Sequence, residues 1–148
     1  MIPQVDNALC RLVSRHLPEG TVVRLDAPKP TWQTETPIHA VDLFLFGLRD
    51  AGPSGVAPPA RGCTLSYLVT ARASTVGEEH QLLDVALRAL LDVDTIPAEY
   101  LPEGCASACV GIADTDPAGL WISLGMPARA GFVATVTAVI ASVVGSAP

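Results

Sequence analysis

The sequence feature that most constrains the fold is an apolar run from Phe132 to Val144. Its thirteen residues are fewer than the roughly 20 that an α-helix needs to span a bilayer. The run is also rich in valine, isoleucine and threonine, whose branching at Cβ favours strands. We therefore expect a long final strand over residues 131–143 and no insertion into a membrane.

Other segments rich in β-branched or aromatic residues are bounded by turn residues, which is the pattern of strands. We expect strands over residues 21–26, 39–48 and 63–73, and a short strand over residues 110–113. The segment from Gly52 to Gly62 is rich in glycine and proline, which indicates a connection. Residues 94–109 are expected to form a loop.

Two helices are expected where apolar residues recur every three or four positions. The first covers residues 4–17. The second covers residues 79–93, and Thr75 and Glu78 before it have the spacing of a capping box, in which each side chain bonds the other's backbone N–H. The expected apolar faces are Val5, Leu9, Leu12, Val13 and Leu17 in the first helix, and Leu82, Leu83, Ala86, Leu87 and Leu90 in the second.

A shorter third helix is expected between Asp116-Pro117 and Gly125. Aspartate suits the N-cap and proline the first helical position, while glycine readily ends a helix. We expect Trp121 of this helix to lie in the core, together with residues 43–46 of the second strand.

The expected order is helix, three strands, helix, short strand, helix and strand. This order is typical of an α/β (α+β) fold, with a mixed, mostly antiparallel sheet and helices packed on it. The chain has 148 residues, of which 49% are hydrophobic and 16% charged. This length and balance indicate one folded domain over residues 1–148 and exclude a disordered chain.

The charge balance excludes a nucleic-acid partner. The chain has nine basic and fifteen acidic residues, a net charge of −6, and its only lysine is Lys29. Neutralising phosphates requires a cationic surface. The first residues lack the basic and apolar regions of a secretory signal, and four cysteines are too few for a disulfide scaffold, so we expect a cytoplasmic protein.

No motif for nucleophilic catalysis, phosphate binding or zinc proteolysis occurs in the sequence. The three histidines, His16, His39 and His80, are far apart and lack companion ligands at metal-binding spacing. We expect each of them at the surface or at a helix end. The sequence therefore predicts no catalytic residue, no cofactor and no metal site.

Cys105 and Cys109 form the only closely spaced pair of thiols. Such a pair could be a redox couple or half of a metal site. The spacing is C-x3-C, however, and no second Cys or His pair accompanies it. We interpret both as buried or half-buried structural thiols.

One long segment carries acidic residues alone. Between Arg88 and Arg129 there is no lysine or arginine. The segment contains Asp92, Asp94, Glu99, Glu103, Asp114 and Asp116. This acidic segment is either a solvated loop surface or a surface that attracts a basic protein partner.

The order of several segments resembles a known family. The segments are Leu43-Phe44-Leu45-Phe46, Leu65-Ser66-Tyr67-Leu68-Val69-Thr70-Ala71, the apolar helix pattern from Glu79 to Leu90, and Leu120-Trp121-x-x-Leu124-Gly125. With its proline-rich separations, this succession is similar to the N-terminal domain of the cap, or tail-terminator, proteins of extracellular contractile injection systems of the antifeeding-prophage type. The resemblance extends over nearly the whole chain.

The resemblance implies a tail-terminator-like fold and a structural role. Such proteins form a ring, expected to be sixfold, that closes the distal end of the inner tube and holds the sheath to it. The family supplies no catalytic or cofactor residues. Members tend to have an aromatic residue before the arginine that corresponds to Arg129 and a serine shortly after it, whereas here the neighbours are Pro127, Ala128, Ala130 and Gly131. We therefore include Arg129 with the acidic residues as a candidate interface residue.

Two other interpretations remain open from the sequence. One is a small enzyme or ligand-binding domain whose polar residues converge only in three dimensions, and such a site would have a concave pocket with ionisable groups. The other is a cargo or adaptor module of the same kind of particle.

Overall fold

The computed structural model describes residues 1–36, 38–54, 60–101 and 103–141. The elements in this part of the chain are α1 (Ile2–Ser14), β1 (Val22–Arg24), η1 (Pro30–Gln33), β2 (Ala40–Ser54), β3 (Ala60–Arg72), α2 (Val76–Leu91), η2 (Ala98–Tyr100), β4 (Cys105–Ile112), α3 (Ala118–Leu124) and β5 (Gly131–Ala141). The five strands form one sheet in the order β1-β2-β3-β5-β4.

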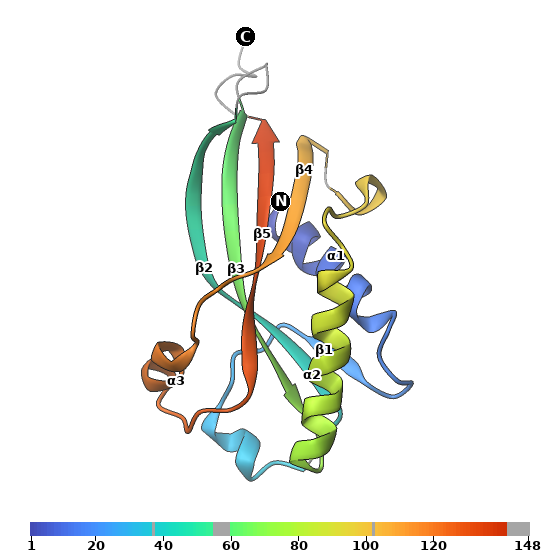
Figure 1. Ribbon diagram of the computed structural model, residues 1–148, viewed down its shortest axis with the longest axis vertical. Coiled ribbons are helices and arrows are strands. Elements are labelled where there is room, and N and C mark those ends of the chain that lie inside the picture. Colours follow the sequence, from blue (N-terminus) through green and yellow to red (C-terminus); the bar gives the residue numbers. More distant parts are fainter. Residues whose placement is uncertain (37, 55–59, 102, 142–148) are drawn as a thin grey trace.

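The sheet is mixed and mostly antiparallel, as predicted. Only β1 runs parallel to its neighbour β2, and the β2–β3, β3–β5 and β4–β5 pairs are antiparallel. Helices α1 and α2 lie together on one face, while α3 lies on the other side near the lower end of the sheet (Figure 1). The predicted fold class is therefore confirmed.

The main core lies between the sheet and helices α1 and α2. Alternate residues of β3 point into it, because successive side chains of a strand face opposite sides; Leu65, Tyr67 and Val69 are fully buried there. The Tyr67 hydroxyl donates a hydrogen bond of 2.6 Å to the Asp6 carboxylate of α1. Burial and this carboxylate raise the pKa of Tyr67. The bond fixes α1 to the centre of the sheet.

Helix α2 begins with one half of the predicted capping box, and the Glu78 carboxylate contacts His39 instead of the Thr75 backbone. The Thr75 hydroxyl accepts a 3.2 Å hydrogen bond from the backbone N–H of Glu78, which satisfies a donor that the first helical turn leaves free. The helix begins at Val76, three residues earlier than predicted. Its face is also rotated from the prediction, because Leu83 and Leu87 are only half-buried. The fully buried positions are Leu82, Ala86, Ala89 and Leu90.

Several predicted boundaries of strands and of α1 were wrong. Helix α1 ends at Ser14 rather than at residue 17, and β1 has three residues rather than six. Strands β2 and β3 extend through part of the segment predicted as a connection, because their backbones pair with each other out to Ser54 and Ala60. The last residues of the predicted final strand, 142–143, lie outside the described part of the chain.

Strand β4 is the largest error of the sequence prediction. It runs from Cys105 to Ile112, although residues 94–109 were predicted as a loop. Its sequence is rich in alanine, serine and cysteine and has no clear alternation of apolar and polar residues. Pairing with β5, which is strongly β-branched, supplies the hydrogen bonds that make it a strand.

The third helix and its tryptophan agree with the prediction. Helix α3 ends at Gly125, whose φ of 67° is a left-handed conformation that favours glycine. Asp116 accepts a hydrogen bond from the backbone N–H of Ala118, although the N-cap position itself belongs to Pro117. Trp121 is buried against Leu68 and Met126.

The expected burial of residues 43–46 holds only in part. Leu43 is buried, and Phe44 and Leu45 are half-buried. Phe46 lies at a register shift between β2 and β3 and is 36% exposed. Phe46 is two residues after Phe44 and, like it, lies on the sheet face opposite the main core, where it lines a groove with Val133.

Candidate interaction site

A buried ion pair lies where β2 and β3 meet the loop before β2. Asp42 of β2 is completely buried, and Arg72, the last residue of β3, donates two hydrogen bonds to it. The Nε–Oδ2 distance is 2.9 Å and the Nη2–Oδ1 distance is 3.0 Å. Burial raises the pKa of Asp42, and the guanidinium group of Arg72 opposes that rise. This two-bond geometry is the strong form of an arginine–carboxylate pair.

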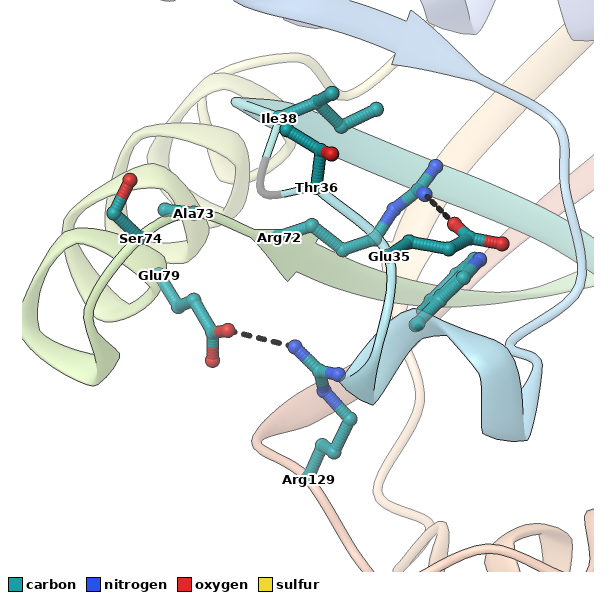
Figure 2. A pocket seen from close by; sticks show the side chains of 9 residues that line it. Glu35, Thr36, Ile38, Arg72, Ala73, Ser74, Glu79 and Arg129 are labelled. Carbon is teal, nitrogen blue, oxygen red and sulfur yellow. Dashed lines mark hydrogen bonds and ion pairs between the residues drawn. The ribbon is translucent and has the colours of Figure 1, made fainter.

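Trp32 of η1 covers the ion pair. The guanidinium carbon of Arg72 lies 4.0 Å from the centre of the Trp32 ring, which is within range of a cation–π contact. Arg129, just before β5, lies 5.9 Å from the same ring. Arg129 also bonds the Glu79 carboxylate of α2 at 2.7 Å and the Ala71 carbonyl at 3.4 Å. Figure 2 shows Arg72, Glu79 and Arg129 approaching one another from separate parts of the chain.

The cavity at this cluster measures about 220 Å³. Its two cations already face carboxylates, because Arg72 bonds Asp42 and Arg129 bonds Glu79. Two more carboxylates, those of Glu35 and Asp26, each lie 4.0 Å from the Arg72 guanidinium group. Acidic groups therefore outnumber basic ones, which disfavours an anionic ligand. The geometry instead fastens residues 26–36 to the sheet and to α2.

Two shallow apolar grooves lie elsewhere on the surface. One, of about 350 Å³, runs between α2 and the start of β5 and includes Leu83, Leu87 and Phe132. The other, of about 290 Å³, lies on the sheet face opposite α1 and α2, and Phe46 and Val133 are among its lining residues. Neither groove brings together the paired carboxylates or the nucleophile and base that a hydrolytic site requires.

The structure divides the acidic segment into two groups. All six acidic residues are exposed. Glu99 and Glu103 come shortly before the start of β4. The other four lie toward the end of this strand: Asp114 and Asp116 follow it, and Asp92 and Asp94 run alongside its second half, where the Val110 N–H bonds the Asp94 carbonyl at 2.9 Å. The start and end of β4 are roughly 25 Å apart along an extended strand. They are two surfaces rather than one.

Arg129 differs from the acidic residues in its surroundings. Its side chain is 18% exposed and is engaged by Glu79, so the structure gives it an internal contact that the sequence did not predict. Its role as an interface residue remains a prediction.

The two neighbouring thiols point to opposite faces of the sheet. Cys105 packs against the main core, while Cys109 lies opposite Thr137 on the other face and is exposed. Residues four apart in a regular strand share a face, but a register shift between Cys105 and Ser107 adds one residue and reverses this relation. The prediction of a buried or half-buried thiol therefore holds for Cys105 and was wrong for Cys109.

The histidines lie at the surface, as predicted. His16, His39 and His80 are exposed. His39 contacts the Glu78 carboxylate at 3.2 Å. Within the described ranges, no three His, Cys, Asp or Glu side chains gather in a way that could hold a metal ion. The helices in those ranges are also too short or too polar to cross a bilayer.

The Arg72 cluster was not predicted from the sequence. Asp42 and Arg72 are thirty positions apart, and Trp32 lies in a segment that shows no periodicity. One signal was available: Asp42 is the only charged residue in the apolar segment 39–48. A carboxylate within a buried strand requires a partner, because an unpaired buried charge is very unfavourable.

Two solved structures share the fold of this chain. The PVC sheath/tube terminator of an extracellular contractile injection system, in its extended state, matches with a TM-score of 0.71 and 18% identity, over 95% of this chain and 56% of that chain. The anti-feeding prophage cap matches with a TM-score of 0.67 and 19% identity, over 92% of this chain and 53% of that one. The chain thus spans about half the length of each.

No curated protein sequence matches the chain significantly. The Pvc16 N-terminal domain family, in contrast, matches residues 4–142. These findings confirm the predicted resemblance and the tail-terminator-like fold. Because the match covers nearly the whole sequence, the chain belongs to the Pvc16 N-terminal domain family.

Proposed function

We propose that the chain forms part of a ring of six copies that caps the distal end of the tube and sheath of a contractile injection particle. The observation that carries this proposal is the likeness to the PVC sheath/tube terminator over 95% of the chain. A ring of identical copies needs two different, complementary surfaces on each copy. The two acidic groups and the free edge of the sheet provide distinct surfaces for such contacts.

The proposed role is structural and needs no catalysis, cofactor or metal ion. The buried Arg72 pair supports this, because its charges are satisfied within the chain and serve to hold a loop in place. We further propose that residues 1–148 act as one domain, that its partners are other copies together with the tube and sheath proteins, and that the particle assembles in the cytoplasm.

Deleting the gene tests the capping role. We expect particles that are unstable or of uncontrolled length, measured by electron microscopy of sheared preparations. Complementation with the wild-type gene restores uniform particles, and end-on averages of their capped ends show six copies. Particles of normal length and stability without the gene would contradict the proposal.

The acidic groups are the proposed partner-facing surfaces. Reversing their charge weakens assembly if they meet basic residues, because opposite charges across an interface are replaced by like charges. We expect Glu99→Lys with Glu103→Lys, and separately Asp114→Lys, to reduce the amount of the chain bound per particle while leaving thermal unfolding unchanged. Asp116 is left intact because it bonds the first turn of α3.

Glu19→Lys is the matched control, since Glu19 is an exposed acid outside the acidic segment. It changes the net charge of the chain without changing either group. If all these variants assemble as the wild type does, the acidic segment is a solvated surface. If only one group has an effect, that group alone faces a partner.

A further inference from the structure

Strand β2 has a long free edge. On its outer side β1 pairs only with Ala40, Val41 and Asp42. Residues 43–54 pair with β3 on the inner side and have no strand beside them on the outer side in the described part of the chain (Figure 1). The free edge from residue 43 to residue 50 is about 26 Å long at the usual rise of a strand.

The backbone of this edge lacks partners. Among the described residues, the backbone hydrogen bonds of positions 43–51 are confined to the ladder with β3, and Gly52 beyond them donates its N–H to the Asp50 carboxylate at 2.8 Å. Every second residue of an antiparallel edge strand directs its N–H and C=O groups outward. Such a row of free groups is a template on which another extended chain can pair.

The first half of the free edge, residues 43–48, carries exposed apolar side chains and no charge. Phe46 is 36% exposed and Leu48 is 54% exposed. Natural edge strands usually carry charges, prolines or bulges that prevent pairing. The far half of this edge has such features: Arg49, Asp50, a second register shift between Asp50 and Gly52, and Pro53. The half that holds Phe46 and Leu48 has one register shift and no charge. Exposed apolar side chains on a free edge indicate a surface that is covered in the assembly.

A second copy of the chain does not provide the matching edge within a ring. The outer strands of the sheet are β1 and β4. Strand β1 has only three residues, too few to match the free edge of β2. The middle of β4 already bonds residues 94–96: the Ile96 N–H donates to the Ala108 carbonyl at 2.8 Å, and the Val110 N–H donates to the Asp94 carbonyl at 2.9 Å. Two β2 edges could pair with each other, but such a self-complementary contact closes a two-fold dimer, whereas a ring of six requires head-to-tail contacts.

We propose that the free edge of β2 receives an extended segment of a different protein of the particle, which adds a sixth strand to the five-stranded sheet. The segment carries apolar side chains that cover Phe46 and Leu48. It also carries a carboxylate opposite Arg49, which is exposed and has no ion pair among the described residues. This inference rests on the proposed function, because it requires the chain to be part of a particle.

Site-specific photocrosslinking tests the pairing. A benzoylphenylalanine replaces Phe46 in one variant and Leu48 in another, and particles that contain each variant are purified, irradiated and digested. We expect both probes to react with one short stretch of a single particle protein other than this chain, identified by mass spectrometry. The same probe at Leu91, which is 58% exposed at the end of α2, does not react with that stretch.

The outcomes separate this inference from the proposed function. If the Leu91 probe variant is recovered in particles but the β2 probes react with no other protein, or only with another copy of the chain, the strand addition is wrong and the capping role stands. Reaction at scattered sites of several proteins also overturns it. If no variant and no wild-type chain is found in particles, the proposed function fails and this inference fails with it.

A pair of substitutions gives a second measurement. Leu48→Lys places a charge on the free edge, and Leu91→Lys places the same charge on a helix. Loss of paired backbone and apolar contacts predicts at least about a tenfold drop in the fraction of Leu48→Lys chain bound to particles, the effect of roughly 1.4 kcal/mol. Leu91→Lys should bind within about twofold of the wild type, well under that energy. Equal binding by both variants would overturn the inference.

Discussion

The two faces of the sheet are stabilised in different ways. Against α1 and α2 the sheet presents one continuous apolar core, which includes Leu65, Tyr67 and Val136. The opposite face is divided into three parts: the Arg72 cluster under Trp32, a small apolar cluster under α3, and an uncovered area near Phe46.

The difference shows on which face the loss of one side chain is better tolerated. In the continuous core each side chain has many apolar neighbours, so the loss of one leaves a cavity of limited cost. On the opposite face the stability of a part depends on a single pair of residues. The predictions below compare the two faces, beginning with the largest effect.

The largest effect is expected on the divided face, from Asp42→Ala. The substitution leaves the Arg72 guanidinium group buried without its carboxylate, and breaking a buried pair in this way costs about 3–5 kcal/mol. The free energy of unfolding, measured with urea, should fall by that amount. Replacing both members, Asp42→Ala with Arg72→Met, should recover a large part of the loss, because no unpaired charge then remains buried.

Asp50→Ala is the matched control for this pair. Asp50 also bonds an arginine, Arg61, but both side chains are more than half exposed. Water screens an exposed pair, so the urea midpoint should not change measurably. Equal losses from Asp42→Ala and Asp50→Ala would show that the buried pair does not stabilise the divided face.

A smaller effect is expected on the continuous face, from Leu90→Ala. Leu90 is 2% exposed, so its truncation should cost about 3 kcal/mol. Leu87→Ala, on the same helix but half-buried, should cost about 1 kcal/mol because less apolar area is removed from contact. The same urea experiment measures both. A larger loss from Leu87→Ala would mean that the predicted helix face, and not the observed one, lies in the core.

The smallest effect concerns the thiols and does not involve folding stability. Cys109 is exposed on the divided face, whereas burial raises the pKa of Cys10, which packs against the continuous core, to about 11. Because the thiolate is the reactive form, iodoacetamide at pH 8 should modify Cys109 first and Cys10 much more slowly, as followed by mass spectrometry. Cys109→Ser should remove the fast phase alone.

Replacing Cys105 and Cys109 together by alanine addresses their interpretation as structural thiols. We expect this variant to assemble as the wild type does, because the two thiols lie on opposite faces and cannot act on one substrate or metal ion. Stoichiometric zinc in the purified wild-type protein would contradict this expectation.

The continuous face could be predicted from the sequence because its signals are local. The cap at Thr75 and the apolar spacing of Leu82, Ala86 and Leu90 lie within one helix. Periodicity reports such faces directly. Periodicity also placed Leu83 and Leu87 in the buried face of α2, but both are only half-buried. The spacing of apolar residues gives no information on where the neighbouring strand ends.

The divided face could not be predicted because its contacts join distant positions. Arg72 meets Asp42 across a strand pair and Trp32 across a loop, and nothing in the local sequence links these three residues. Strand β4 was missed for a related reason, since its small residues form a strand only when β5 pairs with them. The candidate interface residues could be identified by their charge. Their separation into two groups could not be predicted, because it depends on how β4 pairs.

The pairing of β3 has a mechanical consequence. This strand is hydrogen-bonded on both sides, to β2 and to β5, over nearly all of its length. A force directed along the strand must break both ladders together in shear, whereas β1, held by three residue pairs at its single partner, can be pulled away alone. Under tension the chain should therefore yield first at β1, and the β2–β3 pair should be the last part to separate.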